Sequence, residues 1–518
     1  MGKKNVTRRE FLELSSITLA GGYLGLKSAQ AAAGMMGGGM GGMGGGMGGM
    51  GGGSTGVIDP PPGLRFQDPP VLQNMFPLAK NLVEVSLEAS ATPVNLNGSI
   101  ANLLTYNGSF PGPTIRVRNT DTLRIHFRNS LSIPGTNILG HVRDITNLHT
   151  HGLHVSPMGN SDNVMVMVEP GGEFVYEYNL SMHRPGTLDF YHPHVHGTVA
   201  EQYWGGLAGA LIVEDDLSVL EGFETHLMVL KDISIAGGNP APYDTMMDYM
   251  HGKEGNLVTV NGQVNPVLPI RPGQVQRWRI LNASNARYYK LALEGHMLQL
   301  VGTDGGLLDR PYPLSQIVVA PGERVDLLVK ANPTTRNYRL LSLAYDRGCG
   351  GMGQQVTLLT MSCKGKSSAN DAGIPAVVDP EAVRIPLESV ATRRLVLSMG
   401  QGKGYINGVS FAGMNATTTV DSSLGTCEVW EIVNQSGMDH PFHQHVNPCQ
   451  VLSVSGGDPA SAALYANKPA WKDVVNIPKF GSASLLVPVA DFDGMAMFHC
   501  HIVEHEDIGM MGIWNIMP

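Results

Sequence analysis

A short segment near the C-terminus constrains the fold of this chain more than any other. It reads Phe498-His499-Cys500-His501-Ile502-Val503-Glu504-His505, and Met510 follows five residues later. One cysteine thiolate, a histidine and a distant methionine, joined by a second histidine, are the ligands of a blue, electron-transfer copper. Successive side chains of a strand point to opposite faces, so Cys500 faces one way while His499 and His501 face the other. The segment therefore predicts a strand that contacts two metal centres.

Three further histidine clusters supply candidate ligands for the second centre. They are His149-Thr150-His151, His192-Pro193-His194 and His440-Pro441-Phe442-His443-Gln444-His445. Each contains an H-x-H pair, a spacing that places both imidazoles on one face of an extended strand. Imidazole suits copper, which outcompetes the other divalent first-row metals at nitrogen sites. Zinc also takes histidine and cysteine, but it does not explain a cysteine between two histidines with a methionine downstream.

In these four motifs and their order, the chain resembles the multicopper oxidase family, which includes copper-efflux oxidases, bacterial laccases and bilirubin oxidases. The resemblance covers roughly residues 70 to 518 and implies four copper ions: one type 1, one type 2 and two type 3. By resemblance, the type 1 copper is held by His440, Cys500 and His505, with Met510 axial. The type 2 copper is held by His149 and His443. The type 3 pair is held by His151, His192, His194, His445, His499 and His501.

The count of metals implies the reaction. Reduction of dioxygen to two waters takes four electrons, whereas most small donors give one at a time, and four coppers store the four. We expect a one-electron oxidation of phenols, aromatic amines or low-valent metal ions such as Cu(I). An axial Met510 favours a low to medium type 1 potential, although Met511 lies next to it. Asp162 and Glu506 resemble the proton-relay acids of the family; the alternative for both is to orient histidine ligands.

The start of the chain predicts export. Lys3, Lys4, Arg8 and Arg9 precede a moderately apolar stretch from Leu14 to Leu26, and Thr7-Arg8-Arg9-Glu10-Phe11-Leu12 is a twin-arginine signature. A cleavage site fits Ala29-Gln30-Ala31, with residues 31–33 as a rival. Residues 1–31 are therefore predicted to be a Tat-type signal peptide, which gives a periplasmic or extracytoplasmic protein. The apolar run is too short for a membrane anchor.

Residues 34–53 consist almost only of glycine and methionine. Such a segment cannot bury a core, so residues 32–69 are predicted to be a disordered leader and linker. The leader is either a spacer or a means of Cu(I) capture, because thioethers select Cu(I). Met246, Met247, Met250 and Met352 could extend a Cu(I) surface or simply fill the core. By resemblance, copper-efflux oxidases carry a methionine-rich insert in the last domain. The matching stretch here, about residues 400 to 425, is short and has few methionines, which argues against a direct copper-efflux assignment and favours a more open type 1 site.

Composition agrees with an exported all-β protein. Short strand-like segments alternate with Gly, Pro, Asn and Asp turns, for example at 114–127, 174–180, 275–281, 325–330 and 395–399. We expect three consecutive cupredoxin-like Greek-key β-sandwich domains, at 70–216, 217–380 and 381–518. The middle domain has no ligand motif and is expected to act as a spacer between the other two.

The net charge is −9, and the first 31 residues carry five basic and two acidic side chains, so their removal leaves about −12. This charge argues against nucleic acid as a partner; no membrane span is expected in the mature form, and a monomer is expected. Cys500 is assigned to copper, and Cys427 with Cys449 is the favoured disulfide among the other four cysteines, ahead of Cys349 with Cys363; free thiols are the alternative.

Eight histidines lie outside the motifs, and His154 and His196 beside them are expected to be structural. Asp439, next to His440, is a candidate contact for donors. Phe190 stands where the family commonly has Trp, two residues before His192.

Two other classes of protein remain open: a copper-sequestering resistance protein with incidental oxidase activity, and a non-enzymatic relative that lost its coppers, as some exported cell-division proteins did. The second predicts missing ligands, and none of the ten expected histidines is missing. A two-domain nitrite reductase is disfavoured because the second histidine of H-C-H would have no metal to bind in such a protein.

Overall fold

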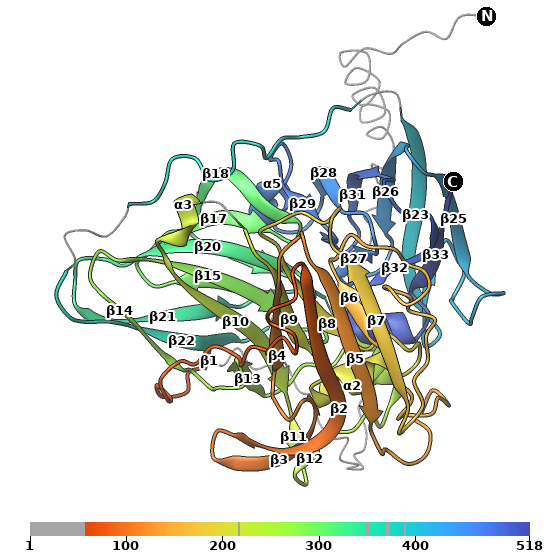
Figure 1. The fold of residues 1–518 in the computed structure, drawn as a ribbon, viewed down its shortest axis with the longest axis horizontal. Coiled ribbons are helices and arrows are strands. Elements are labelled where there is room, and N and C mark those ends of the chain that lie inside the picture. Colours follow the sequence, from red (N-terminus) through yellow and green to blue (C-terminus); the bar gives the residue numbers. More distant parts are fainter. Residues whose placement is uncertain (1–56, 216–217, 349–352, 368–372, 388–389) are drawn as a thin grey trace, which may run out of the picture. The chain divides into compact units, whose positions relative to one another are not determined.

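The computed structural model describes residues 57–215, 218–348, 353–367, 373–387 and 390–518. Within these residues the chain forms three successive pairs of β-sheets (Figure 1), so the predicted all-β class is confirmed. The expected signal peptide and the Gly/Met leader, as well as Cys349 and Met352, lie outside the described residues. No helix of the described part is both long and apolar enough to cross a membrane.

The first sandwich pairs two four-stranded sheets. One has the strand order β3 (Ser99–Tyr106), β2 (Leu82–Leu96), β5 (Thr122–Ser130) and β7 (Glu173–Asn179). The other has the order β4 (Gly112–Val117), β9 (Gly209–Val213), β8 (Leu188–His192) and β6 (His149–His151), and helix α2 (Val199–Gly205) follows β8. The predicted strand at 114–127 is wrong as a single element, because residues 118–121 form a turn that carries the chain from one sheet to the other.

The middle sandwich is larger. Its first sheet orders β1 (Val57–Ile58), β22 (Gln355–Cys363), β21 (Arg336–Leu343), β16 (Tyr289–Leu293) and β19 (Ile317–Val319), with β14 (Val267–Ile270) also on β22. Its second orders β13 (Leu257–Val260), β10 (Glu224–Ile233), β15 (Val275–Asn282), β20 (Arg324–Lys330), β17 (Leu298–Thr303) and β18 (Gly306–Leu314). Beside them lie α3 (Ser218–Glu221), β11 (Ile235–Ala236), β12 (Asn239–Pro240) and α4 (Met246–His251).

The third sandwich carries most of the predicted ligands. One sheet orders β24 (Lys403–Ile406), β23 (Ala391–Gly400), β26 (Cys427–Asn434), β31 (Ser482–Pro488), β28 (Cys449–Ser455) and β29 (Trp471–Lys472). The other orders β25 (Thr418–Ser423), β33 (Met511–Met517), β32 (Gly494–Cys500), β27 (His440–Gln444) and β30 (Val474–Ile477). Helices α5 (Pro459–Leu464) and α6 (Val503–Asp507) complete it.

The residues just before the first sandwich belong to the middle one. Val57 and Ile58 pair in parallel with Gln355 and Val356 of β22, and Phe66 is 7% exposed within the same apolar core. The expectation that the leader and linker stay disordered as far as residue 69 is therefore wrong for residues 57–69. Burial of Phe66 gives this segment an apolar contact with that core.

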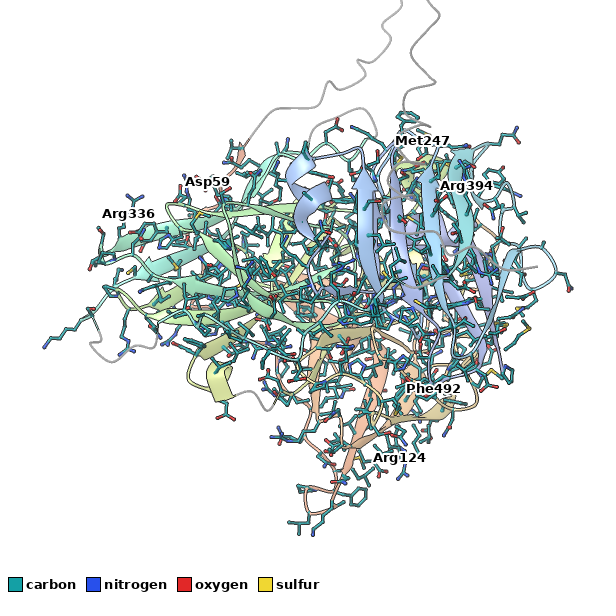
Figure 2. All side chains as sticks on the ribbon, turned by 90° about the horizontal axis from the view of Figure 1, so that it is seen from above. Asp59, Arg124, Met247, Arg336, Arg394 and Phe492 are labelled. Atoms are coloured by element: carbon teal, nitrogen blue, oxygen red, sulfur yellow. The ribbon has the colours of Figure 1, made fainter. Side chains whose placement is uncertain are left out.

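The cores of the middle and third sandwiches are continuous. Trp278 of β15, Trp430 of β26 and Cys500 of β32 belong to one cluster of buried residues. Figure 2 shows Arg124, Arg336 and Arg394 at the outer edges of the first, middle and third sandwiches. The ligand strands lie at the opposite, inner sides: in Figure 1, β6 of the first sandwich lies beside β27 of the third, and the rings of His149 and His443 are 5.8 Å apart.

Candidate metal centres

The first centre lies on one face of β32. The Sγ atom of Cys500 is 3.4 Å from Nδ1 of His440 and 3.5 Å from Nδ1 of His505, and the two nitrogens are 3.2 Å apart. All three side chains are fully buried. Each comes from a different element: β27, β32 and α6. Helix α6 follows β32 after two residues, and this reversal of the chain places His505 next to the Cys500 sulfur.

The far nitrogens of both rings are held by hydrogen bonds. Nε2 of His440 is 2.7 Å from the Ser436 hydroxyl, and Nε2 of His505 donates to the carbonyl of Met250 in α4, at 3.3 Å. These contacts leave Nδ1 as the free atom of each ring. Met510 is also fully buried, and its backbone carbonyl accepts a hydrogen bond from the Cys500 N–H. Burial raises the pKa of the Cys500 thiol, so a bound cation is needed to hold it as thiolate.

The second centre gathers the four H-x-H pairs. β6 pairs with β8 so that His149 faces His192, and β27 pairs with β32 so that His443 faces His499. The ring of His151 stacks on that of His443 at 3.7 Å, and the ring of His149 on that of His445 at 4.1 Å. Histidines of the first and third sandwiches thus form one cluster, and its potential ligand atoms fall into triplets within 4.8 Å of one another. Examples are His151, His192 and His501, and also His443, His445 and His499.

The outward nitrogens of these rings are held in place. Nδ1 of His149 lies 2.9 Å from the Asp162 carboxylate, and Asp162 also accepts from the N–H and hydroxyl of Thr150. Nδ1 of His192, His443 and His499 donates to the carbonyls of Pro193, Asp473 and Cys500 respectively. Nε2 of His151 lies 3.0 Å from Oδ1 of Asp473. Such contacts fix the ring orientation and tautomer of a metal-ligating histidine.

The inward nitrogens of these rings converge, and several of them have no hydrogen-bond partner. Buried nitrogens without a hydrogen-bond partner include Nε2 of His149, His192 and His443 and Nδ1 of His151. Nε2 of His499 faces Nε2 of His194 at 3.2 Å and Nε2 of His445 at 3.3 Å. Burial lowers the pKa of His499 to about 3 and lowers the pKa of His151, His192, His194, His443, His445 and His501 well below the usual value. Neutral imidazoles with converging lone pairs fit copper ions.

The middle sandwich does not act only as a spacer, because its residues also pack against this histidine cluster and enclose it. Gly322 has φ +81°, and a Cβ there would lie 2.9 Å from the His501 ring, so no larger side chain fits without a shift. Arg324, fully buried, bonds to Asp473 through both terminal nitrogens and lies 3.4 Å from Asp189 of the first sandwich. Lys472 bridges Asp304 and Glu323 of the middle sandwich, at 2.8 Å each. Burial raises the pKa of Asp473 to about 6, and Arg324 opposes this shift.

Three buried carboxyl groups follow the H-C-H segment, all within α6. Glu506 lies 3.5 Å from Nδ1 of His194 and 3.3 Å from Nδ1 of His499. Asp507 accepts from the backbone N–H groups of Gly197 and Ala200. Glu504 accepts from the hydroxyl of Tyr243 in the middle sandwich. Burial raises the pKa of Glu506 well above that of a carboxyl in water, and the neighbouring Asp507 adds to the shift.

Some expectations from the sequence are wrong. Cys427 and Cys449 are both free thiols: β31 lies between their strands, so two strand spacings separate them, further than a disulfide reaches. Asp439 is 2% exposed and is bonded to Tyr345, Asn476 and the Lys479 N–H, so it is not on a donor-facing surface.

Phe190, which stands where the family commonly has Trp, stacks on the His151 ring at 4.2 Å and so supports a ligand. His154 is structural, as expected: it bonds to Val446 and Asp491. Motif reasoning missed Asp473 and Arg324, which lie alone in the sequence and carry no local signal.

Fold and site together define a blue-copper-like centre joined through one strand to a cluster of eight histidines between the first and third of three sandwiches. Family models described as multicopper oxidase match residues 88–218, 223–360 and 388–518. A multicopper oxidase of Staphylococcus haemolyticus is 30% identical over 80% of this chain and 84% of its own length. The chain belongs to the multicopper oxidase family.

Two further comparisons agree. A laccase of Bacillus subtilis is 27% identical over 83% of this chain and 93% of its own length. The solved structure of a multicopper oxidase from Campylobacter jejuni, described as a metallo-oxidase, has a TM-score of 0.75 and 28% identity, covering 88% of this chain and 96% of that chain. The protein is therefore a copper-dependent oxidoreductase that uses four coppers and couples the oxidation of donors to the reduction of dioxygen to water.

Proposed function

We propose that His440, Cys500, His505 and Met510 hold the type 1 copper, and that His149 and His443 hold the type 2 copper. The type 3 coppers are assigned to His151, His192 and His501 and to His194, His445 and His499. The observation that carries this assignment is the convergence of buried ring nitrogens: some have no hydrogen-bond partner, and those of His194, His445 and His499 face one another. When bound, the coppers would accept electrons singly at the type 1 site and pass four of them to dioxygen at the other three.

The chain's own residues prepare both sites. The backbone from Cys500 to His499 and His501 joins them covalently. Ser436 and the Met250 carbonyl hold the two type 1 imidazoles with Nδ1 towards the sulfur. Asp162 orients His149, and we assign to it and to Glu506 the delivery of protons, since both are buried carboxyl groups in contact with ligand rings.

Electrons are proposed to enter where α4 covers His505. The Met250 carbonyl contacts the His505 ring, and Met246 and Met247 on the same helix are 38% and 55% exposed. Figure 2 shows Met247 near the edge of the molecule. Thioethers favour Cu(I) as the donor, while phenols or aromatic amines reach the same helix from outside. The methionines of residues 34–53 are proposed to capture Cu(I) for this site.

The remaining assignments rest on the sequence. The domains are proposed to span 70–216, 217–380 and 381–518, with residues 57–69 attached to the middle domain. Residues 1–31 are proposed to direct export by the twin-arginine route to the periplasm or an equivalent compartment, where the protein acts as a monomer in copper homeostasis.

The deciding experiment measures oxygen consumption by the copper-loaded mature protein with Cu(I) or with a methoxyphenol, each with and without residues 34–53. Fast Cu(I) turnover that falls on deletion identifies a cuprous oxidase fed by its leader. Fast phenol turnover that is indifferent to deletion identifies a laccase. Copper tolerance that depends on the leader while turnover does not would instead favour a copper-sequestering protein. Cys500→Ser is the control, because it removes the type 1 sulfur and should abolish turnover with either donor.

A further inference from the structure

A cavity of about 630 Å³ opens beside the histidine cluster, between the first and third sandwiches. Its inner end reaches His194, which is 3% exposed. Six methionines are among the residues that line it: Met165, Met167, Met246, Met414, Met497 and Met511. We refer to this cavity as the methionine pocket.

The six methionines fall into an exposed group at the opening and a buried group further in. Met165, Met167, Met246 and Met414 are between 38% and 62% exposed, whereas Met497 and Met511 are each 2% exposed. Methionine commonly fills gaps in a core, and this accounts for the two inner residues. It does not account for four exposed thioethers from three different sandwiches meeting at one opening.

The inner methionines lead directly to copper ligands. Met497 and His499 lie two residues apart on β32, so their side chains share one face of the strand. Met511 of β33 is the cross-strand partner of His499. The Met497 carbonyl accepts the backbone N–H of His445. Thioether sulfurs thus continue the line of imidazoles outward from the cluster to the surface.

Two histidines outside the ligand motifs add nitrogen donors to the pocket. His141 and His196 both line it, and their ring centroids are 5.7 Å apart. Nδ1 of His196 is buried and has no hydrogen-bond partner. Thioether and imidazole ligands together select Cu(I) over harder cations. Lys403 is the only lysine or arginine on the lining, and Asp507 is its only carboxylic acid.

We propose that the methionine pocket binds Cu(I) and is the route by which copper ions reach the trinuclear histidines during assembly of the holoenzyme. The pocket is distinct from the electron-accepting surface at α4 and His505, although Met246 lies at the edge of both. No redox step is involved: Cu(I) passes from sulfur to imidazole ligands.

The site is tested with Ag(I), a soft monovalent ion that does not react with dioxygen, titrated calorimetrically into the copper-loaded full-length protein. The variant combines Met165→Leu, Met167→Leu and Met414→Leu, which remove sulfur and keep apolar volume. The matched control combines Met75→Leu, Met297→Leu and Met517→Leu, which are also exposed but lie outside the pocket. Both retain residues 34–53, so binding by the leader is the same in each.

We expect the pocket variant to bind Ag(I) at least about tenfold more weakly than the control, or to lose one equivalent of it. Identical isotherms would overturn the proposal. The route is tested on copper-free full-length protein by adding Cu(I) without oxygen, stopping with the chelator bicinchoninate and counting copper retained by the protein over time. Slower uptake by the pocket variant supports the route, and equal rates in variant and control overturn it even if Ag(I) binding differs.

A folding defect does not confuse these outcomes. Met167 is the most exposed of the six, at 62%, so Met167→Leu alone tests the mouth of the pocket in a variant whose core is untouched. The chain's unfolding midpoint, compared with the parent before copper is added, identifies any variant that must be replaced by this single substitution.

Discussion

Arg324 and Asp473 form a bidentate ion pair in the interior, with Nη1 2.5 Å from Oδ1 and Nη2 2.6 Å from Oδ2. Arg324 belongs to the middle sandwich and Asp473 to the third. Oδ1 of Asp473 also lies 3.0 Å from Nε2 of His151, in the first sandwich. The orientation of one proposed copper ligand therefore depends on side chains from all three sandwiches.

Arg324→Met should lower the free energy of unfolding by about 3–5 kcal/mol, since it leaves Asp473 buried without its partner. Urea unfolding of the copper-free protein measures the loss. Arg339→Met is the matched control, because Arg339 is 41% exposed in its pair with Glu294 and should cost no more than about 1 kcal/mol. Equal losses in the two variants would contradict the structural role of Arg324.

Asp162→Asn should lower turnover by roughly 10–100-fold while copper stays bound, because the neutral amide cannot take up and pass on a proton and has one acceptor oxygen in place of the two that contact His149. The pH–rate profile and the copper content of the purified variant test this. Asp491→Asn is the control: Asp491 contacts His154, which is not a proposed ligand. Unchanged turnover and profile in Asp162→Asn, with copper bound, would exclude the relay role.

Met510→Leu should raise the reduction potential of the type 1 copper, since a weak axial thioether lowers that potential. Redox titration of the blue absorption measures it. Met511→Leu provides the comparison, because Met511 is also buried and adjacent but lines the methionine pocket. A shift in Met511→Leu and none in Met510→Leu would reverse the assignment.

The stability of the copper-free protein should fall as the pH is lowered from about 7 to about 5. Burial lowers the pKa of twelve histidines below the usual value: His141, His151, His192, His194, His196, His296, His440, His443, His445, His499, His501 and His505. Between these pH values the histidines of the unfolded chain bind protons, whereas those of the folded chain stay neutral. Their contribution to the free energy of unfolding is therefore complete above about pH 6.5 and decreases as the pH falls below it.

Six buried carboxyl groups act in the opposite direction, because burial raises their pKa: Glu323, Asp439, Asp473, Glu504, Glu506 and Asp507. They stabilise the fold while protonated and lose that contribution as the pH rises. The histidines outnumber them, so the net change follows the histidines. Thermal unfolding midpoints over this pH range test the sign, and the copper-loaded protein should be less sensitive because bound imidazoles do not take up protons. A midpoint that rises on acidification would contradict the prediction.

The sequence predicted the parts of this molecule that are encoded locally. The H-x-H spacing of His149 and His151 and the alternation around Cys500 follow from strand geometry alone, and the structure brings these residues together as expected. Contacts between distant segments left no such pattern. Asp473 contacts Arg324 only because the three sandwiches pack against one another. The predicted pairing of Cys427 with Cys449 is wrong because β31 lies between their strands, and no local sequence pattern indicates that strand order.

The alternation of β32 also limits how this protein can change. Deleting one residue before Phe498 would turn Cys500 towards the histidine cluster and His499 towards the core, so both centres would fail together. A one-residue change of register in β32 therefore cannot remove the electron-accepting copper site and leave the oxygen-reducing cluster intact. Gradual divergence is confined to substitutions, and insertions or deletions should survive only in the loops that flank the strand.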